Sequence, residues 1–134
     1  MVEFEEALTI RIAVFVDEQG VPANLEYEFE ADCEHYLAMV KNKAVGTARY
    51  RKTKTGIKLE RFAVLKDFRK MGVGSDLVRA LLFSLNGMKN IYLHAQVQVV
   101  NFYSEFGFVA VGDRFEEAGI EHFVMYYQPK TEMD

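Results

Sequence analysis

The chain has 134 residues, half of them hydrophobic, and carries 16 Lys and Arg against 20 Asp and Glu, a net charge of −4. This length and composition predict one domain, residues 1–134, with a single core, and exclude a disordered chain. The acidic balance argues against a general nucleic-acid binder, and the lone cysteine excludes an internal disulfide. No apolar run approaches the roughly 20 residues that span a bilayer, and the acidic N-terminus lacks a signal-peptide pattern, so we expect a cytoplasmic protein.

The spacing of hydrophobic residues predicts the order of elements along the chain. Phe4, Leu8, Ile12 and Phe15 recur at helical spacing, which predicts an amphipathic helix over residues 4–15. An acidic loop or short helix is expected over residues 26–34. The expected strands are 35–41, 44–52, 57–64, 91–96, 108–115 and 121–127, with a hairpin turn at Asn42-Lys43, one helix around residues 77–85 and a short one around 99–106. This order indicates a mixed α/β sheet with helices against it.

A glycine-rich loop joins the strand over residues 57–64 to the helix that follows. It reads Arg69-Lys70-Met71-Gly72-Val73-Gly74, and Ser75 comes next. The first N–H groups of a helix have no partner inside it, and the helix dipole makes that end positive. Glycines remove the Cβ atoms that would keep a pyrophosphate away from those N–H groups. The loop therefore predicts a clamp for a phosphorylated ligand, although an ordinary strand-to-helix turn also fits two glycines. A Walker A pattern and a third glycine of a dinucleotide fingerprint are both absent.

The order strand, R-x-x-G-x-G loop, helix, strand, F-Y helix and G-F resembles the GNAT (Gcn5-related) N-acetyltransferases over nearly the whole chain. The residues similar to the small bacterial branch typified by ElaA and YjcF are Val14 to Pro22, His35, Gly46 to Arg49, Leu59 to Arg61, Ala95-Gln96, Phe102-Tyr103, Gly107-Phe108 and Ala118 to His122. The resemblance implies a mostly antiparallel central sheet with a splayed parallel pair. It also implies a strand before the first helix. Only about three residues precede that helix here, so we expect this strand to be short or missing.

By this resemblance the ligand is acetyl-coenzyme A. Its pyrophosphate would lie on the loop residues Arg69, Lys70, Met71, Gly72, Val73, Gly74 and Ser75. In the family the preceding strand bulges, which would leave backbone groups of Phe62, Ala63 and Val64 free for the pantetheine arm. A plain sheet strand is the alternative. The resemblance also implies cofactor contacts from Gln96, Phe102 and Tyr103. Many members have Asn where this chain has Gln96, and the narrower branch has Gln.

The resemblance also implies catalytic residues. Tyr103 is the candidate general acid, since a phenol aimed at the leaving thiolate can protonate it; a core aromatic is the alternative. Glu60 and Glu18 are candidate bases for the amine, against the alternative of solvated or ion-paired carboxylates. Acceptor contacts are implied for Gln19, His35 and His122, although hydrogen-bonded structural histidines fit equally. The histidines lack metal-ligand spacing, so no metal is expected.

We therefore expect an N-acetyltransferase that transfers an acetyl group from acetyl-CoA to a primary amine of a small molecule or peptide by direct attack in a ternary complex. A catalytically silent acyl-CoA sensor is the main alternative. Acyl transfer to a non-standard acceptor, as in the homoserine-lactone synthases, is a further one. No nucleic-acid or membrane partner is expected. The last strand, Phe123 to Tyr127, is either a packed strand or the edge of a homodimer.

Overall fold

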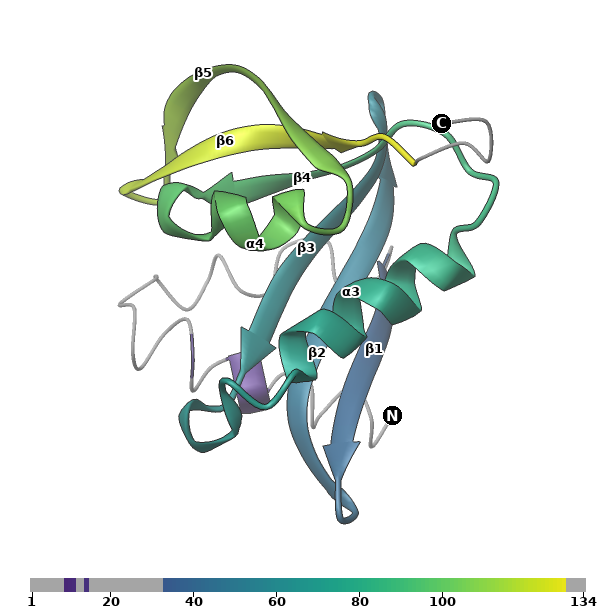
Figure 1. The fold of residues 1–134 in the computed structure, drawn as a ribbon, viewed down its shortest axis with the longest axis vertical. Helices are drawn as coiled ribbons and strands as arrows, with labels where there is room; N and C mark the ends of the chain where they lie inside the picture. The colour runs from purple at the N-terminus through teal and green to yellow at the C-terminus, as the bar shows by residue number, and fades with distance from the viewer. Residues whose placement is uncertain (1–8, 12–13, 15–32, 130–134) are drawn as a thin grey trace.

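Six strands form one mixed sheet in the part of the chain that the structure describes, residues 9–11, 14 and 33–129 of a computed structural model (Figure 1). The strands are β1 (Cys33–Val40), β2 (Lys43–Thr53), β3 (Gly56–Val64), β4 (Ile91–Gln96), β5 (Phe108–Glu117) and β6 (Ile120–Tyr127). The helices are α3 (Val73–Ser84) and α4 (Val100–Ser104), with 3-10 turns at Lys66–Phe68 and Val97–Val99. The strand order is β1-β2-β3-β4-β6-β5, and only β3 and β4 run parallel among these described strands. The expected mixed α/β fold is confirmed.

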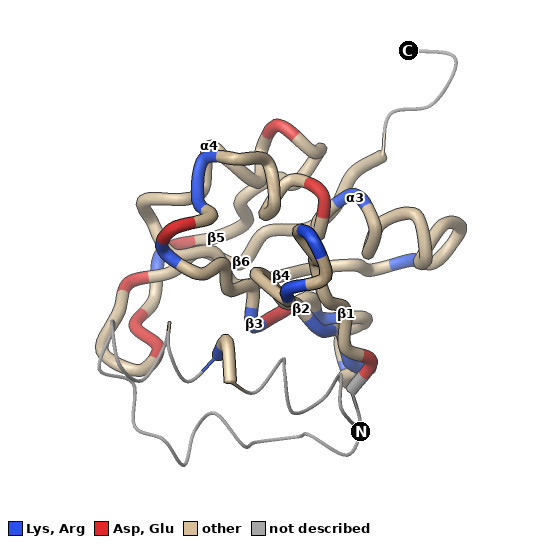
Figure 2. Tube along the Cα trace, turned by 90° about the horizontal axis from the view of Figure 1, so that it is seen from below, with Lys and Arg blue, Asp and Glu red and all other residues tan. Residues whose placement is uncertain are grey.

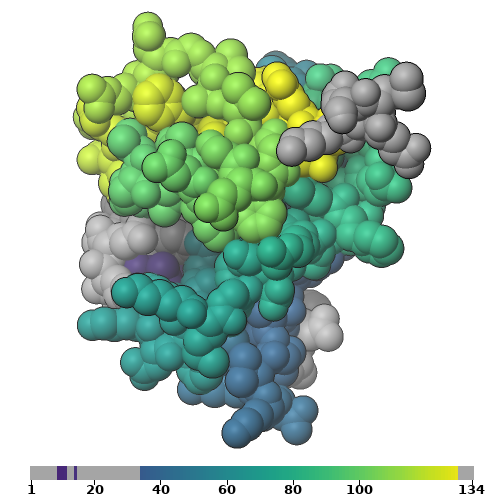
Figure 3. Space-filling model, viewed as in Figure 1, coloured from purple at the N-terminus to yellow at the C-terminus, as the bar shows by residue number. Residues whose placement is uncertain are grey.

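Helices α3 and α4 lie on one face of the sheet, and the helical residues 9–11 lie on the other (Figures 1 and 2). Alternation along β3 explains this division. Ile57 and Leu59 join the buried core under α3, whereas Lys58 and Glu60 are directed to the opposite face. The space-filling view shows α3 and the α4 region covering the helix face (Figure 3). We call the other side of the sheet the open face; Ile10 and Val14 pack against part of it, and the rest carries the polar residues described below.

The parallel strands β3 and β4 separate after a short stretch of pairing. Their register contains three pairs, from Ile57 opposite Ile91 to Leu59 opposite Leu93. On its other side β3 stays paired with β2 as far as Val64, through an irregularity in which Arg49 opposes Glu60 and Thr47 opposes Ala63. Two residues of β3, Arg61 and Phe62, therefore face one residue of β2, Ala48. Arg61 has a left-handed φ of 57°. This β-bulge and the short parallel pairing confirm the expected splayed pair.

Two tight hairpins fix the registers of two antiparallel pairs, β1 with β2 and β5 with β6. Lys41-Asn42 joins β1 to β2 with φ values of 49° and 67°, and Ala118-Gly119 joins β5 to β6 with 52° and 79°. Positive φ at both central residues is what a type I′ turn requires. The expected turn at Asn42-Lys43 is therefore wrong by one residue, because Asn, which tolerates this conformation, takes the second central position.

Several sequence expectations change at the edges of the sheet. Cys33 and Glu34 belong to β1 rather than to the expected acidic segment. The segment from Phe123 to Tyr127 lies in β6, between β4 and β5, so the interpretation of this segment as a dimer edge is wrong. The edge strand on this side of the described sheet is β5, where Val109 and Val111 are exposed. The helix expected over residues 4–15 is seen at 9–11, and the expected short or missing first strand lies outside the described residues.

Candidate active site

The loop before α3 presents backbone amides at the start of a helix. Lys70 and Gly72 both adopt left-handed conformations, with φ values of 66° and 82°. No side chain caps α3, and the Asp76 N–H donates to the Gly72 carbonyl at 3.0 Å. The N–H groups of residues 73–75 therefore lie ahead of the first intrahelical hydrogen bond. Amides in this arrangement form a surface that binds anions.

Three contacts hold this loop in place. The Arg69 Nε donates to the Val64 carbonyl at 2.9 Å, which ties the loop to the end of β3. A Cβ at Gly46 would lie 2.7 Å from Val73 Cγ1, so the glycine in β2 allows α3 to begin close to the sheet. A Cβ at Gly74 would lie 3.5 Å from the Phe102 ring. The start of α3 is thus beside α4, and the loop and Phe102 are brought together as the sequence predicts.

Tyr103 lies on the helix face against the bulged part of β3. Its ring is 5.6 Å from that of Phe62 and 5.1 Å from that of Phe102, both edge-on. Tyr103 is 8% exposed, and no described residue hydrogen-bonds to its hydroxyl. Burial raises the pKa of the Tyr103 phenol above its ordinary value. The phenol is therefore protonated at neutral pH, beside the point where β3 and β4 diverge.

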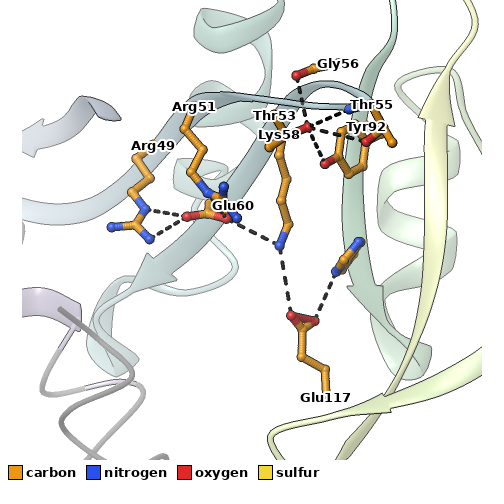
Figure 4. A network of polar contacts seen from close by, with 10 residues as sticks. Arg49, Arg51, Thr53, Thr55, Gly56, Lys58, Glu60, Tyr92 and Glu117 are labelled. Atoms are coloured by element: carbon orange, nitrogen blue, oxygen red, sulfur yellow. Dashed lines mark hydrogen bonds and ion pairs between the residues drawn. The ribbon is translucent and has the colours of Figure 1, made fainter. Parts of the chain in front are cut away.

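Glu60 is the centre of an ion-pair network on the open face (Figure 4). The buried Arg49 pairs with Glu60 Oε2, while Arg51 Nε and Lys58 Nζ lie 3.1 Å and 3.4 Å from Oε1. Burial alone would raise the pKa of Glu60, but the charges of Arg49, Lys58 and Arg51 outweigh it and lower that pKa. A carboxylate held as an anion among cations is a poor proton acceptor. The geometry favours a structural role for Glu60.

A second polar group on the open face joins His94 to Glu117. The His94 Nδ1 lies 3.1 Å from Glu117 Oε2, and Lys58 Nζ lies 3.9 Å from Glu117 Oε1. The hydrogen bond from His94 is the main cause that lowers the pKa of Glu117 to about 2, against the effect of burial and with help from the Lys58 charge. Sequence reasoning missed this pair. Alternation along β4 could have indicated that His94 lies on the face of the sheet opposite to that of the core residue Leu93. Nothing local indicates Glu117 as the partner of His94.

The structure brings some of the other predicted residues together and keeps others apart. Gln96 ends β4 and lies opposite His122 of β6, so these two are neighbours beside the diverging strands. His35 lies in β1 opposite Arg49, with three strands between β1 and β6, so it does not share a site with His122. Ala63 and Val64 follow the bulge in β3. Glu18 and Gln19 lie outside the described residues.

Two features of the described residues bear on metals and membranes. Among them, no three His, Cys, Asp or Glu side chains are grouped as a metal ion would require. In the same part of the chain, no helix is both long enough and apolar enough to cross a bilayer.

A mixed sheet with a splayed parallel pair and an amide-lined helix start beside it defines an acyltransferase-like class of fold. A sequence model of the acetyltransferase (GNAT) domain matches residues 4–129, and the chain belongs to this family. The uncharacterised N-acetyltransferase YjcF of Bacillus subtilis (strain 168) is 38% identical over 127 residues, covering 92% of this chain and 91% of YjcF.

Solved structures agree with this assignment. The crystal structure of Escherichia coli ElaA matches with a TM-score of 0.83 and 29% identity, over 96% of this chain and 91% of ElaA. A GNAT family acetyltransferase from Elizabethkingia anophelis with acetyl-CoA bound matches with a TM-score of 0.69, over 81% of this chain and 84% of its own. At 15% identity, this second likeness concerns the fold alone. The expected family and its small bacterial relatives are confirmed.

Proposed function

We propose that this protein is an N-acetyltransferase that transfers the acetyl group of acetyl-CoA to the primary amine of a small molecule or peptide. The observation that carries the proposal is the splay of β3 from β4 after three residue pairs, next to the uncapped start of α3. A peptide-like arm that enters the splay can pair with backbone groups that no neighbouring strand uses. The amides at the start of α3 can hold the phosphates at the end of that arm.

The residues present fit acetyl-CoA. The loop residues 69–75 combine helix-start amides with the exposed cations Arg69 and Lys70, which suits a diphosphate. Phe62 lies in the bulge, Ala63 and Val64 follow it where β3 has no parallel partner, and Gln96 and Phe102 border the same region. When bound, acetyl-CoA supplies an activated thioester. The solved relative from Elizabethkingia anophelis contains acetyl-CoA on the same fold, which supports the choice of ligand.

In this proposal Tyr103 supplies a proton to the sulfur that leaves. Its hydroxyl is buried, protonated and uncommitted to any described hydrogen-bond partner. His122 lies on the open face beside Gln96 and is proposed to contact the acceptor. Glu60 orders the cations around it rather than accepting a proton. The roles predicted for Glu18, Gln19 and His35 stay predictions.

The alternative of a silent acyl-CoA sensor is less favoured. A sensor needs the phosphate clamp and the splay but has no use for a protonated phenol at the same place. Tyr103 occupies that place next to Phe62. A protein that only binds acyl-CoA would therefore carry, in Tyr103, a proton donor that has no function in binding.

The test has two stages. Calorimetry with acetyl-CoA alone should show binding at one site, and absence of binding would refute the clamp. A free-thiol assay with acetyl-CoA and a panel of amines, polyamines, aminosugars and peptides should then show thiol release that depends on the amine. Binding without thiol release across the panel would favour the sensor over the transferase.

A further inference from the structure

His94 occupies the position on β4 at which the parallel pairing ends. Leu59 opposite Leu93 is the last pair of the register, so His94 is the first residue of β4 beyond it. On its other side it remains paired with Val124 of β6, which fixes its backbone. Its side chain belongs to the open face, because its Nδ1 meets Glu117 there and Leu93, its neighbour in sequence, is in the core under α3. The imidazole is 24% exposed, so a small molecule can reach it.

Glu117 is placed and charged to orient this imidazole. The Ala118-Gly119 turn ends β5 directly after Glu117. A large irregularity between Val111 and Phe115 determines which face of the sheet each later side chain of β5 lies on. One carboxylate oxygen faces His94 and the other faces Lys58. With a pKa of about 2, Glu117 is an anion at any pH used to assay acetyl transfer. A carboxylate that accepts from Nδ1–H holds a neutral imidazole in the tautomer whose Nε2 is free to take a proton.

The gap between β3 and β4 thus has a protonated phenol on one side and an oriented imidazole on the other. Tyr103 belongs to the core of the helix face, and His94 belongs to the open face. Acyl transfer needs both functions close to the reacting carbon, since the attacking amine must lose a proton and the departing thiolate must take one up. The fold supplies both at the place where the strands diverge.

We propose that His94 is the general base of the acetyl transfer and that Glu117 is its positioning residue; this rests on the proposed function. As the amine nitrogen forms its bond to the acetyl carbon, its proton passes to Nε2 of His94. As the carbon–sulfur bond breaks, the sulfur takes the phenolic proton of Tyr103. Solvent then carries the proton from the imidazolium to the phenolate. The amine and the thioester have become an amide and a thiol, and both side chains are restored.

Two other residues fit the role of base less well. His122 also has its Nδ1 occupied, by the Ile120 carbonyl at 2.7 Å, but it is 8% exposed and lies on β6, one strand further from the gap. Glu60 is the residue of β3 that follows the last pair, yet three cations surround it. His94 alone among these three combines an anionic partner with a position on a strand that borders the gap.

The side chains around His94 come from the neighbouring strands as well as from β4 itself. Lys58 approaches from β3 through Glu117, and Glu117 itself comes from β5. Tyr92 lies 5.9 Å away on β4. Phe115 packs edge-on at 5.0 Å and separates His94 from His122 of β6.

The experiment compares full-length His94→Gln, Glu117→Gln and a matched control, Glu121→Gln. Glu121 lies on the same hairpin, and its pairing with Arg114 at 3.3 Å is exposed. For each protein, calorimetry gives the acetyl-CoA affinity, the free-thiol assay gives kcat and KM with the best amine of the panel, and imidazole nitrogen NMR gives the tautomer of His94. His94→Gln should lower kcat by about 100-fold, the scale of general base catalysis, with unchanged acetyl-CoA affinity. Glu117→Gln should lower kcat by about tenfold, as loss of an orienting partner does, and should change the NMR signature. The control should match the wild type.

Each outcome separates this proposal from the function on which it rests. A wild-type kcat in His94→Gln would overturn the base while leaving the transferase intact. A wild-type His94 with its proton on Nε2 would overturn the role of Glu117. If His94→Gln fails to fold, the isosteric Glu117→Gln and the NMR signature decide. A wild type that binds acetyl-CoA but acetylates no amine would refute the proposed function, and the base with it.

Discussion

Gly74→Ala should separate the stability of the protein from its affinity for acetyl-CoA. Gly74 is the second residue of α3, and its backbone is not in the left-handed region, so alanine fits the conformation. The new Cβ would lie 3.5 Å from Phe102 Cζ, an ordinary van der Waals contact. The substitution therefore adds a methyl group to the proposed phosphate surface without straining the free protein.

The two effects have opposite signs. Alanine in place of glycine stabilises a helix by about 0.5–1 kcal/mol in its interior, and a position in the first turn should give about 0.5 kcal/mol. The methyl group would displace the phosphates from the amides of residues 73–75. Loss of one charge-assisted hydrogen bond costs about 1.5–3 kcal/mol, which corresponds to a Kd for acetyl-CoA that is about 10-fold to 100-fold weaker.

Urea unfolding would measure the stability, and calorimetry would measure the affinity. Ser84→Ala is the matched control, since Ser84 is the exposed last residue of the same helix and alanine there raises helix propensity far from the loop. We expect the control to bind acetyl-CoA as the wild type does. A wild-type Kd in Gly74→Ala would show that the phosphates do not lie on this helix start, and the reasoning from the loop would fail.

Three further substitutions test the rest of the site. Tyr103→Phe should lower kcat by about 100-fold with unchanged acetyl-CoA affinity, and since no described residue bonds to the hydroxyl, stability should stay the same. Glu60→Gln should lower the free energy of unfolding by about 3 kcal/mol, because it breaks the buried ion pair with Arg49. Glu117→Gln should lower it by about 1 kcal/mol at neutral pH. The pKa of Glu117 in the folded state, about 2, is below its ordinary value, so its contribution is present above that ordinary value and is lost as the pH falls toward 2. The full shift would give about 3 kcal/mol, but solvent screens a carboxylate that is 42% exposed.

The same measurements can contradict these expectations. Full turnover in Tyr103→Phe would remove the phenol from the mechanism. A Glu60→Gln variant as stable as the wild type would mean that Arg49 finds another anionic partner. For Glu117→Gln, a stability difference that grows as the pH falls would contradict the sign derived from its pKa.

Local patterns predicted the elements whose residues lie next to each other in sequence. Strand β4 was predicted over residues 91–96, its observed bounds, because a short apolar run is flanked there by polar residues. Strand β5 extends two residues beyond its predicted end at Phe115. The irregularity that contains Gly112 interrupts the alternation, and Glu116 and Glu117 do not resemble strand residues.

Long-range register explains what the sequence could not reveal about the site. The loop from Arg69 to Ser75 and the Phe102-Tyr103 pair are short motifs, so each was identified from its own neighbours. The role of Glu60 depends on Arg49 and Arg51, which β2 brings to it through a bulged register. His94 and Glu117 are 23 residues apart and meet through the pairing of β4, β6 and β5. No periodicity within one strand encodes such a contact.

The three-pair junction between β3 and β4 has a mechanical consequence. Strands β1 to β3 with α3 form one half of the described fold, and β4 to β6 with α4 form the other. These halves share few backbone hydrogen bonds at that junction, although buried residues of both belong to one core. A molecule lodged along the junction would crosslink the two halves noncovalently. Amide hydrogen exchange along β3 and β4 should then slow together on ligand addition, as the halves begin to behave as one cooperative unit.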